Sequence, residues 1–162
     1  SDRIAEPFVD APSAFLQGQT FGAHPVSCAV ANANLDVFER EDLCGHVLAN
    51  EDRFKSLIDG LRDIPLVGDV RGDGYFLAIE LVTDQATRGT FDDETADWLL
   101  RGHLSPRLFE AGLICRADDR GEPVITLSPP LIAGEEEFAF IESTLRRVLT
   151  DASREFASRT RS

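Results

Sequence analysis

Two segments of this 162-residue sequence carry residue types that suit the binding of anions. The first is residues 18–25, Gly-Gln-Thr-Phe-Gly-Ala-His-Pro, where a glycine-punctuated turn leads into the start of a helix. Backbone N–H groups at such a turn, with the hydroxyl of Thr20, suit a phosphate group. The second is Arg116, which follows a short apolar run. A guanidinium at the end of a strand can bind a carboxylate through two parallel hydrogen bonds.

Each of these segments also has an ordinary structural explanation. Residues 18–25 can be a loop and helix cap without a ligand, and Arg116 can form a surface ion pair with the acidic residues that follow it, Asp118 and Asp119. The spacing alone leaves both alternatives open. His24 and Cys28 are four residues apart, but no further Cys/His cluster completes a zinc site, so we expect no metal.

The sequence contains no complete catalytic set. It has neither a glycine-rich phosphate loop followed by Lys and Ser/Thr nor a Gly-x-Ser-x-Gly element. Its single lysine, Lys55, stands in a helical stretch near Asp52, Arg53 and Asp59. Such neighbours keep an ammonium group hydrated and charged, whereas a lysine that forms a Schiff base has to lose its proton.

The composition narrows the class of protein. Hydrophobic residues make up 43% and charged residues 28%, which is typical of a globular domain. The net charge of -13 argues against nucleic-acid binding, because phosphates would be repelled. No apolar run reaches the ~20 residues that span a bilayer, so no membrane partner is expected. Three cysteines without a pairing pattern, and no signal-peptide pattern, favour a cytoplasmic location.

The elements that must position these residues are helices and short strands. Apolar residues at helical spacing predict helices that begin at His24 and that cover about 47–61, 94–111 (interrupted near Pro106) and 138–149. Alternating apolar residues and short apolar runs predict strands over 75–81, 113–115 and 124–127, the first preceded by a turn or bulge at Gly72 and Gly74. The expected fold class is α+β, with a small antiparallel sheet and helices packed on one face.

Several segments resemble class III aminotransferases, in the order that the family has them. Residues 20–35 are similar to its T-[FY]-x-[GA]-[HN]-P-x-x-x-A-x-A segment. Residues 70–80, Val-Arg-Gly-Asp-Gly-Tyr-Phe-Leu-Ala-Ile-Glu, resemble its V-R-G-x-G-x-x-x-[AG]-[IV]-E strand. Residues 108–116 and 125–131 are similar to its closing pair of strands, and residues 1–8 resemble the stretch just after its Schiff-base lysine. The resemblance covers most of the chain.

The resemblance implies the domain organisation of a fold-type I transferase that depends on pyridoxal 5'-phosphate (PLP). Residues 1–43 would be the end of the large PLP-binding domain with a long interdomain helix, 44–150 the C-terminal small domain, and 151–162 a basic tail.

The resemblance also implies site residues. Thr20 would donate its hydroxyl to the PLP phosphate across a homodimer interface, assisted by the backbone N–H near Gln19. Arg116 would match the mobile arginine of the ω-transaminase branch, which pairs with a substrate carboxylate and swings away for amines. Gln17 departs from the many relatives that have His before the glycine. The acidic turn after Arg116 could hold its side chain outward.

The resemblance also implies what is missing. The family's reactive lysine lies shortly upstream of the stretch that resembles residues 1–8, and the aspartate that holds the pyridine nitrogen lies further upstream. The sequence contains neither, nor any Met. We therefore expect the C-terminal part of an enzyme that moves an amino group between an amine or amino acid and a keto acid or aldehyde, inactive alone. The alternatives are a non-catalytic interaction module that retains this fold, or an aminomutase or decarboxylase on the same scaffold.

Overall fold

The computed structural model describes residues 6, 8, 22–118 and 123–160. The chain divides into two compact units, residues 1–41 and 42–162. The first unit contains helix α2 (Pro25–Arg40), which begins where the His-Pro pair predicts a helix start. Proline is tolerated there because the first turn needs no backbone donor from that residue. Val26 and Val30 on this helix are 65% and 64% exposed.

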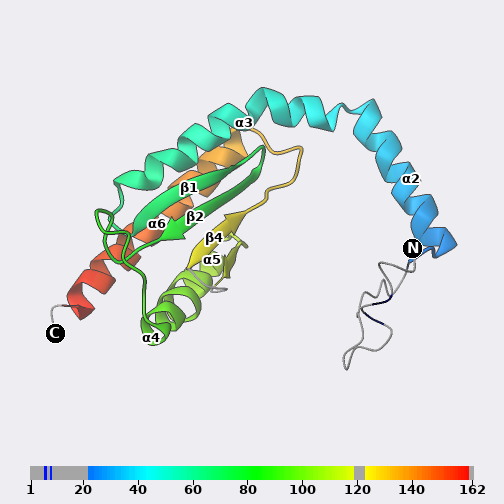
Figure 1. Ribbon diagram of the computed structural model, residues 1–162. Helices are drawn as coiled ribbons and strands as arrows, with labels where there is room; N and C mark the ends of the chain where they lie inside the picture. Colours follow the sequence, from blue (N-terminus) through cyan, green and yellow to red (C-terminus); the bar gives the residue numbers. More distant parts are fainter. Residues whose placement is uncertain (1–5, 7, 9–21, 119–122, 161–162) are drawn as a thin grey trace. The chain divides into compact units, whose positions relative to one another are not determined.

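The second unit is built around a four-stranded antiparallel sheet in the order β1-β2-β4-β3 (Figure 1). The strands are β1 (Val67–Asp73), β2 (Phe76–Leu81), β3 (Arg116–Asp118) and β4 (Val124–Leu127). The helical segments are α3 (Leu43–Asp59), η1 (Gly60–Asp63), α4 (Asp93–Asp97), η2 (Trp98–Leu104), α5 (Ser105–Glu110) and α6 (Glu135–Arg159). The predicted α+β class is confirmed.

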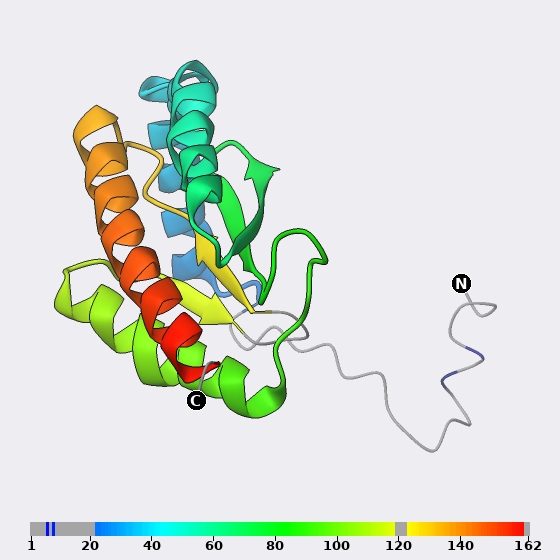
Figure 2. The same ribbon diagram turned by 90° about the vertical axis from the view of Figure 1, so that its left-hand side faces the viewer.

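Helices cover one face of this sheet, as Figures 1 and 2 show for α3 and α6. Alternate side chains of a strand point to opposite faces, so every second residue faces the helices and is buried. Leu77, Ile79 and Ile125 are such residues, and each is at most 1% exposed. The core centres on three aromatic rings. Phe54 of α3 stacks on Phe138 of α6 with ring centroids 4.7 Å apart, and Tyr75 meets Phe138 edge-on at 5.2 Å.

The first two strands form a tight hairpin. Asp73 pairs with Phe76, so only Gly74 and Tyr75 form the turn. Gly74 has a φ of 58°, which suits a glycine at the first central position of a two-residue hairpin. The prediction of a turn at the glycines is confirmed, but β1 itself was not predicted as a strand. Its Gly-Asp-Val-Arg-Gly sequence lacks regular apolar alternation, and its register also shifts between Val67 and Asp69.

Two predicted details are wrong: the place of a helix irregularity and the start of a strand. The irregularity in the third helical stretch is not at Pro106, which lies in the first turn of α5 and is tolerated there. It is η2, which is wound as a π-helix. The strand predicted at residues 113–115 begins at Arg116 instead. Gly112, with a φ of 83°, ends α5, and the next three residues carry the chain from the helix to the edge of the sheet.

The basic C-terminal segment is helical as far as Arg159. Helix α6 continues through it without a break. Ala152 is fully buried, and the Phe156 ring lies 5.4 Å from that of Phe91. Through these contacts the helix end packs against the rest of the second unit.

Candidate active-site surface

The strand register places Arg116 in a row that crosses the sheet. Arg116 pairs with Thr126, Thr126 with Ala78, and Ala78 with Arg71. Residues directly opposite in antiparallel strands share one face of a sheet. Ala78 and Thr126 alternate with the buried residues of their strands, so the row belongs to the face turned away from the helices. The backbone of Arg116 is described, and its side chain lies outside the described part.

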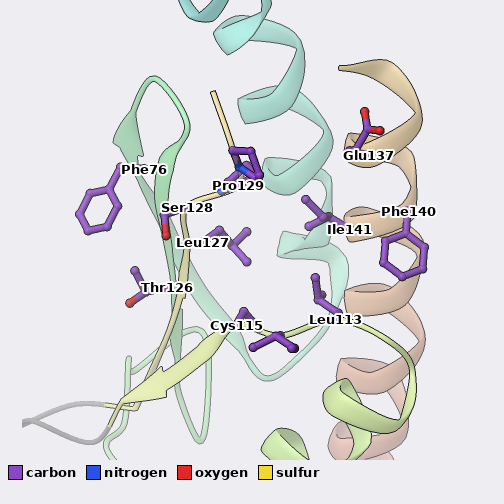
Figure 3. Close-up of a pocket in the computed structure, with 12 residues that line it drawn as sticks. Phe76, Leu113, Cys115, Thr126, Leu127, Ser128, Pro129, Glu137, Phe140 and Ile141 are labelled. Carbon is purple, nitrogen blue, oxygen red and sulfur yellow. The ribbon is translucent and has the colours of Figure 1, made fainter. Parts of the chain in front are cut away.

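A hollow of about 850 Å³ lies beside this row at the end of β4. Figure 3 shows Thr126 and Cys115, the partner and the predecessor of Arg116, among its lining residues. Most of the lining is apolar, and two of its side chains, Phe76 and Ile114, are 66% and 83% exposed. A cluster of exposed apolar side chains is one of the features of a surface that another part of a protein or a ligand covers.

Cys115 lines the hollow but is poorly suited to nucleophilic chemistry. Burial raises the pKa of its thiol to about 11. A thiol with that pKa is almost entirely protonated at neutral pH, and the thiolate is the reactive form. Cys115 therefore contributes an apolar wall beside Arg116.

The loop after β4 is held by three side chains from other elements of the fold. The backbone oxygen of Ala133 accepts a hydrogen bond from the Tyr75 hydroxyl at 3.0 Å and lies 2.9 Å from Nε2 of His46. Burial raises the pKa of Tyr75, so its hydroxyl remains a donor. The Gly134 N–H donates to Glu137 at the start of α6 at 2.9 Å. The proline-rich wall of the hollow is therefore anchored to the hairpin, to α3 and to α6.

The other arginine of the row is engaged in an ion-pair cluster. Arg71 pairs with Glu80, and Arg88 lies 3.7 Å from Asp69 and 3.8 Å from Glu80. Arg62 donates to Asp69 at 2.7 Å and holds the pKa of that carboxyl below its ordinary value. The arginines near β1 are thus already paired with carboxylates of the protein. Arg71 is therefore poorly placed to bind a substrate anion.

Lys55 has a structural position. Its Nζ donates to the backbone oxygen of Gly72 at 2.9 Å and lies 3.5 Å from Asp73, so it ties α3 to the hairpin. Its side chain is 47% exposed. A Schiff-base lysine needs a desolvated position that favours the neutral amine. The described residues therefore do not fit PLP as a covalently held group. Thr20 and Gln19, which were predicted to contact its phosphate, lie outside the described residues.

The described part of the chain offers neither a metal cluster nor a membrane-spanning helix. Residues 6, 8, 22–118 and 123–160 contain no group of three or more His, Cys, Asp or Glu side chains that could hold a metal ion. Among the same residues, no helix is both long and apolar enough to cross a membrane.

Residues 3–149 match the family model described as aminotransferase class-III. This chain belongs to the class III aminotransferases. Members of this family depend on PLP. The resemblance carried by the motifs at residues 20–35, 70–80 and 108–131 is thereby confirmed.

Curated relatives support the same family. The chain is 55% identical over 156 residues to a probable aminotransferase of Mycobacterium tuberculosis, a match that covers 96% of this chain and 33% of the relative. It is 38% identical over 131 residues to ornithine aminotransferase 2 of Staphylococcus saprophyticus, covering 81% of this chain and 28% of that protein. The chain thus spans about a third of the length of the curated relatives it matches.

Solved structures agree. An (S)-enantioselective omega-transaminase from Thermomicrobium roseum is similar with a TM-score of 0.74 and 32% identity, over 94% of this chain and 33% of that one. An omega transaminase from Pseudomonas jessenii, solved in complex with PMP, is similar with a TM-score of 0.74 and 33% identity, over 89% of this chain and 30% of that one. The small sheet and its helices are therefore an aminotransferase substructure.

The sequence predicts a role for Arg116 but does not reveal the surface around it. The hollow is built from residues far apart in the chain, such as Phe76, Ile114 and Phe140, which only the fold brings together. One signal was present. The strand at 124–127 and the short run before it predict a hairpin, and pairing the two would have placed Thr126 near Arg116.

Proposed function

We propose that this chain forms the C-terminal third of a PLP-dependent aminotransferase that moves an amino group between an amine or amino acid and a keto acid or aldehyde. The observation that carries the proposal is the position of Arg116 in the sheet, since its predecessor Cys115 and its strand partner Thr126 both line an apolar hollow. A positive group at an apolar wall suits a small substrate that has one carboxylate and an apolar or extended remainder.

In this proposal the chain supplies binding groups, and the rest of the enzyme supplies the covalent chemistry. Arg116 binds the substrate carboxylate, while Thr20 and the backbone near Gln19 bind the cofactor phosphate across a homodimer interface. Residues 1–43 belong to the large domain, 44–150 form the small domain, and 151–162 form its basic end. The exposed apolar side chains around the hollow are the surface that the other two thirds of a cytoplasmic enzyme would cover. PLP would supply the electron sink for amino-group transfer.

The first test concerns the missing lysine. PLP added to residues 1–162 is expected to give the same absorbance spectrum with the native chain and with Lys55→Gln, because the Nζ of Lys55 is held by Gly72 and Asp73. A protein that also carries the upstream polypeptide is expected to show a Schiff-base band. A band formed by residues 1–162 and abolished by Lys55→Gln would contradict the proposal.

The second test concerns Arg116 in the enzyme that includes the upstream polypeptide. Arg116→Gln is expected to lower kcat/KM for a keto-acid acceptor roughly 10- to 100-fold, because a hydrogen-bonded ion pair is worth about 1.5–3 kcal/mol. The rate with an aldehyde acceptor, which has no carboxylate, is expected to change little. Arg71→Gln is the matched control, since Arg71 lies in the same row but is paired with Glu80.

The comparison of the two arginines decides the assignment. Equal losses for keto acid and aldehyde with Arg116→Gln, or equal losses with Arg71→Gln, would remove Arg116 from substrate binding. Products other than those of amino transfer, identified by substrate profiling, would instead assign the chain to an aminomutase or a decarboxylase of the same family.

A further inference from the structure

A buried histidine lies where the π-helical segment η2 meets the end of α6. His103 is 3% exposed, and its Nδ1 lies 3.2 Å from Oε2 of Glu155. Its Nε2 is buried and has no hydrogen-bond partner among the residues that the structure describes. Nearly all buried polar atoms are hydrogen-bonded, so an unpaired ring nitrogen is unusual. A π-helical turn is itself rare and often marks a functional position.

Contacts around His103 join three helical segments. Glu155 of α6 lies 3.2 Å from His103 of η2 and 3.8 Å from Arg107 of α5. The guanidinium of Arg159 lies 4.0 Å from the ring centroid of Trp98, and the Trp98 ring lies 5.4 Å from that of His103. Polar groups around one imidazole therefore help to hold the last turns of α6 on η2 and α5.

These last turns are distinct from the rest of α6. Phe138, Leu145 and Leu149 are fully buried in the main core. In residues 153–159 the one large apolar side chain is Phe156, which is only partly buried where it packs against the core and meets the ring of Phe91. Residues 153–159 can thus open while the earlier turns, with Ala152, remain packed in the core, as is common for the end of a helix.

The neutral imidazole suits this environment and the protonated one does not. Neutral His103 can donate from Nδ1 to Glu155 and leave Nε2 without a proton. The imidazolium carries a second N–H at Nε2, for which no described residue offers an acceptor. A buried donor without a partner is costly.

The charged groups that face His103 have opposite effects on its pKa. Burial lowers the pKa of His103 most, followed by the positive charge of Arg107, and Arg159 acts in the same direction. Glu155 and Asp151 act in the opposite direction without reversing the shift. Strand β3 also contacts η2, and its side chains lie outside the described part. The folded state therefore binds the proton more weakly than the unfolded chain does.

We infer that His103 is an acid-sensitive latch, which holds residues 153–159 on η2 and α5 when neutral and releases them when protonated. Because the folded pKa is below the ordinary value of 6.5, the latch is fully closed above that pH. Its contribution to stability is lost as the pH falls below 6.5 towards the lower folded value. The latch is independent of the proposed transferase activity, since none of its residues lines the hollow beside Arg116.

Amide hydrogen exchange on residues 1–162 tests the latch. Between pH 7.5 and 5, after correction for intrinsic exchange rates, protection of residues 153–159 is expected to fall about tenfold while that of 138–149 is unchanged. His103→Gln, whose amide does not titrate, is expected to remove this pH dependence. His46→Gln is the control, because His46 contacts the loop at Ala133 and is expected to leave the dependence intact.

Two further variants keep the test decisive if His103→Gln packs poorly. Glu155→Gln removes a charge that favours the protonated form and is expected to move the midpoint of release to lower pH. Arg107→Gln removes a charge that opposes protonation and is expected to move the midpoint to higher pH. Unchanged protection across the pH range, loss of protection along all of α6 together, or shifts of the wrong sign would each overturn the latch.

Discussion

Replacing Phe54 with alanine is expected to lower the free energy of unfolding of the second unit by about 3–5 kcal/mol. Phe54 is fully buried between two other rings, with centroid distances of 4.7 Å to Phe138 and 5.8 Å to Tyr75. Truncation removes both ring contacts and leaves a cavity that α3 and α6 cannot close without moving. Urea denaturation followed by circular dichroism measures the loss.

The loss of the Phe54 ring is also expected to affect the candidate site. Its neighbour Tyr75 donates to the Ala133 oxygen and so fixes the loop that forms one wall of the hollow. Phe109→Ala is the matched control, since Phe109 is 68% exposed on α5 and its loss is expected to change stability by less than about 0.5 kcal/mol. Similar losses for the two variants would mean that the aromatic cluster is not the centre of the core.

The sequence predicts what depends on local periodicity. The apolar face of α6 and the alternating strand around Leu77 and Ile79 repeat over enough residues to identify both elements and their buried sides. The motif at residues 20–35 predicts the family, which the comparisons confirm, and the helix start at Pro25.

The sequence does not predict what depends on contacts between distant elements. The π-helical winding of η2, in which Leu99, Leu100 and Leu104 are buried, is signalled by no local spacing in the sequence. The pairing of Lys55 with the hairpin joins residues 17 positions apart. Nothing in the local sequence distinguishes His103 from other residues of an amphipathic helix. Its partner Glu155 is 52 positions later in the chain, and only the fold brings the two together. The roles of Thr20, Gln19 and Arg116 remain predictions.

Replacing Gly72 with alanine is expected to cost about 3 kcal/mol, because two unfavourable effects add at one position. The backbone of Gly72 has a φ of 125°, a conformation that residues with a Cβ rarely adopt. A Cβ there would lie 2.1 Å from the backbone oxygen of Phe76, and a backbone atom cannot move aside as a flexible side chain can. Urea denaturation again measures the loss.

Gly60→Ala is the matched control for Gly72→Ala. Its added Cβ would lie 3.6 Å from Nη2 of Arg146, an ordinary contact, and its φ of -58° suits alanine. We expect it to be neutral or to stabilise the unit by up to about 1 kcal/mol. A cost for Gly72→Ala no greater than that for Gly60→Ala would show that the hairpin relaxes freely around residue 72.

The hairpin also links stability to the candidate site. Gly72 pairs with Leu77, directly beside Ala78 in the row that leads to Thr126 and Arg116. A strained hairpin shifts β2, and β4 pairs with β2 along its whole length, so the shift reaches the strand that positions Arg116. In the enzyme with its upstream polypeptide, Gly72→Ala should therefore raise KM for a keto acid even at temperatures where the unit stays folded. Unchanged KM in a fully folded variant would mean that the row does not depend on the hairpin.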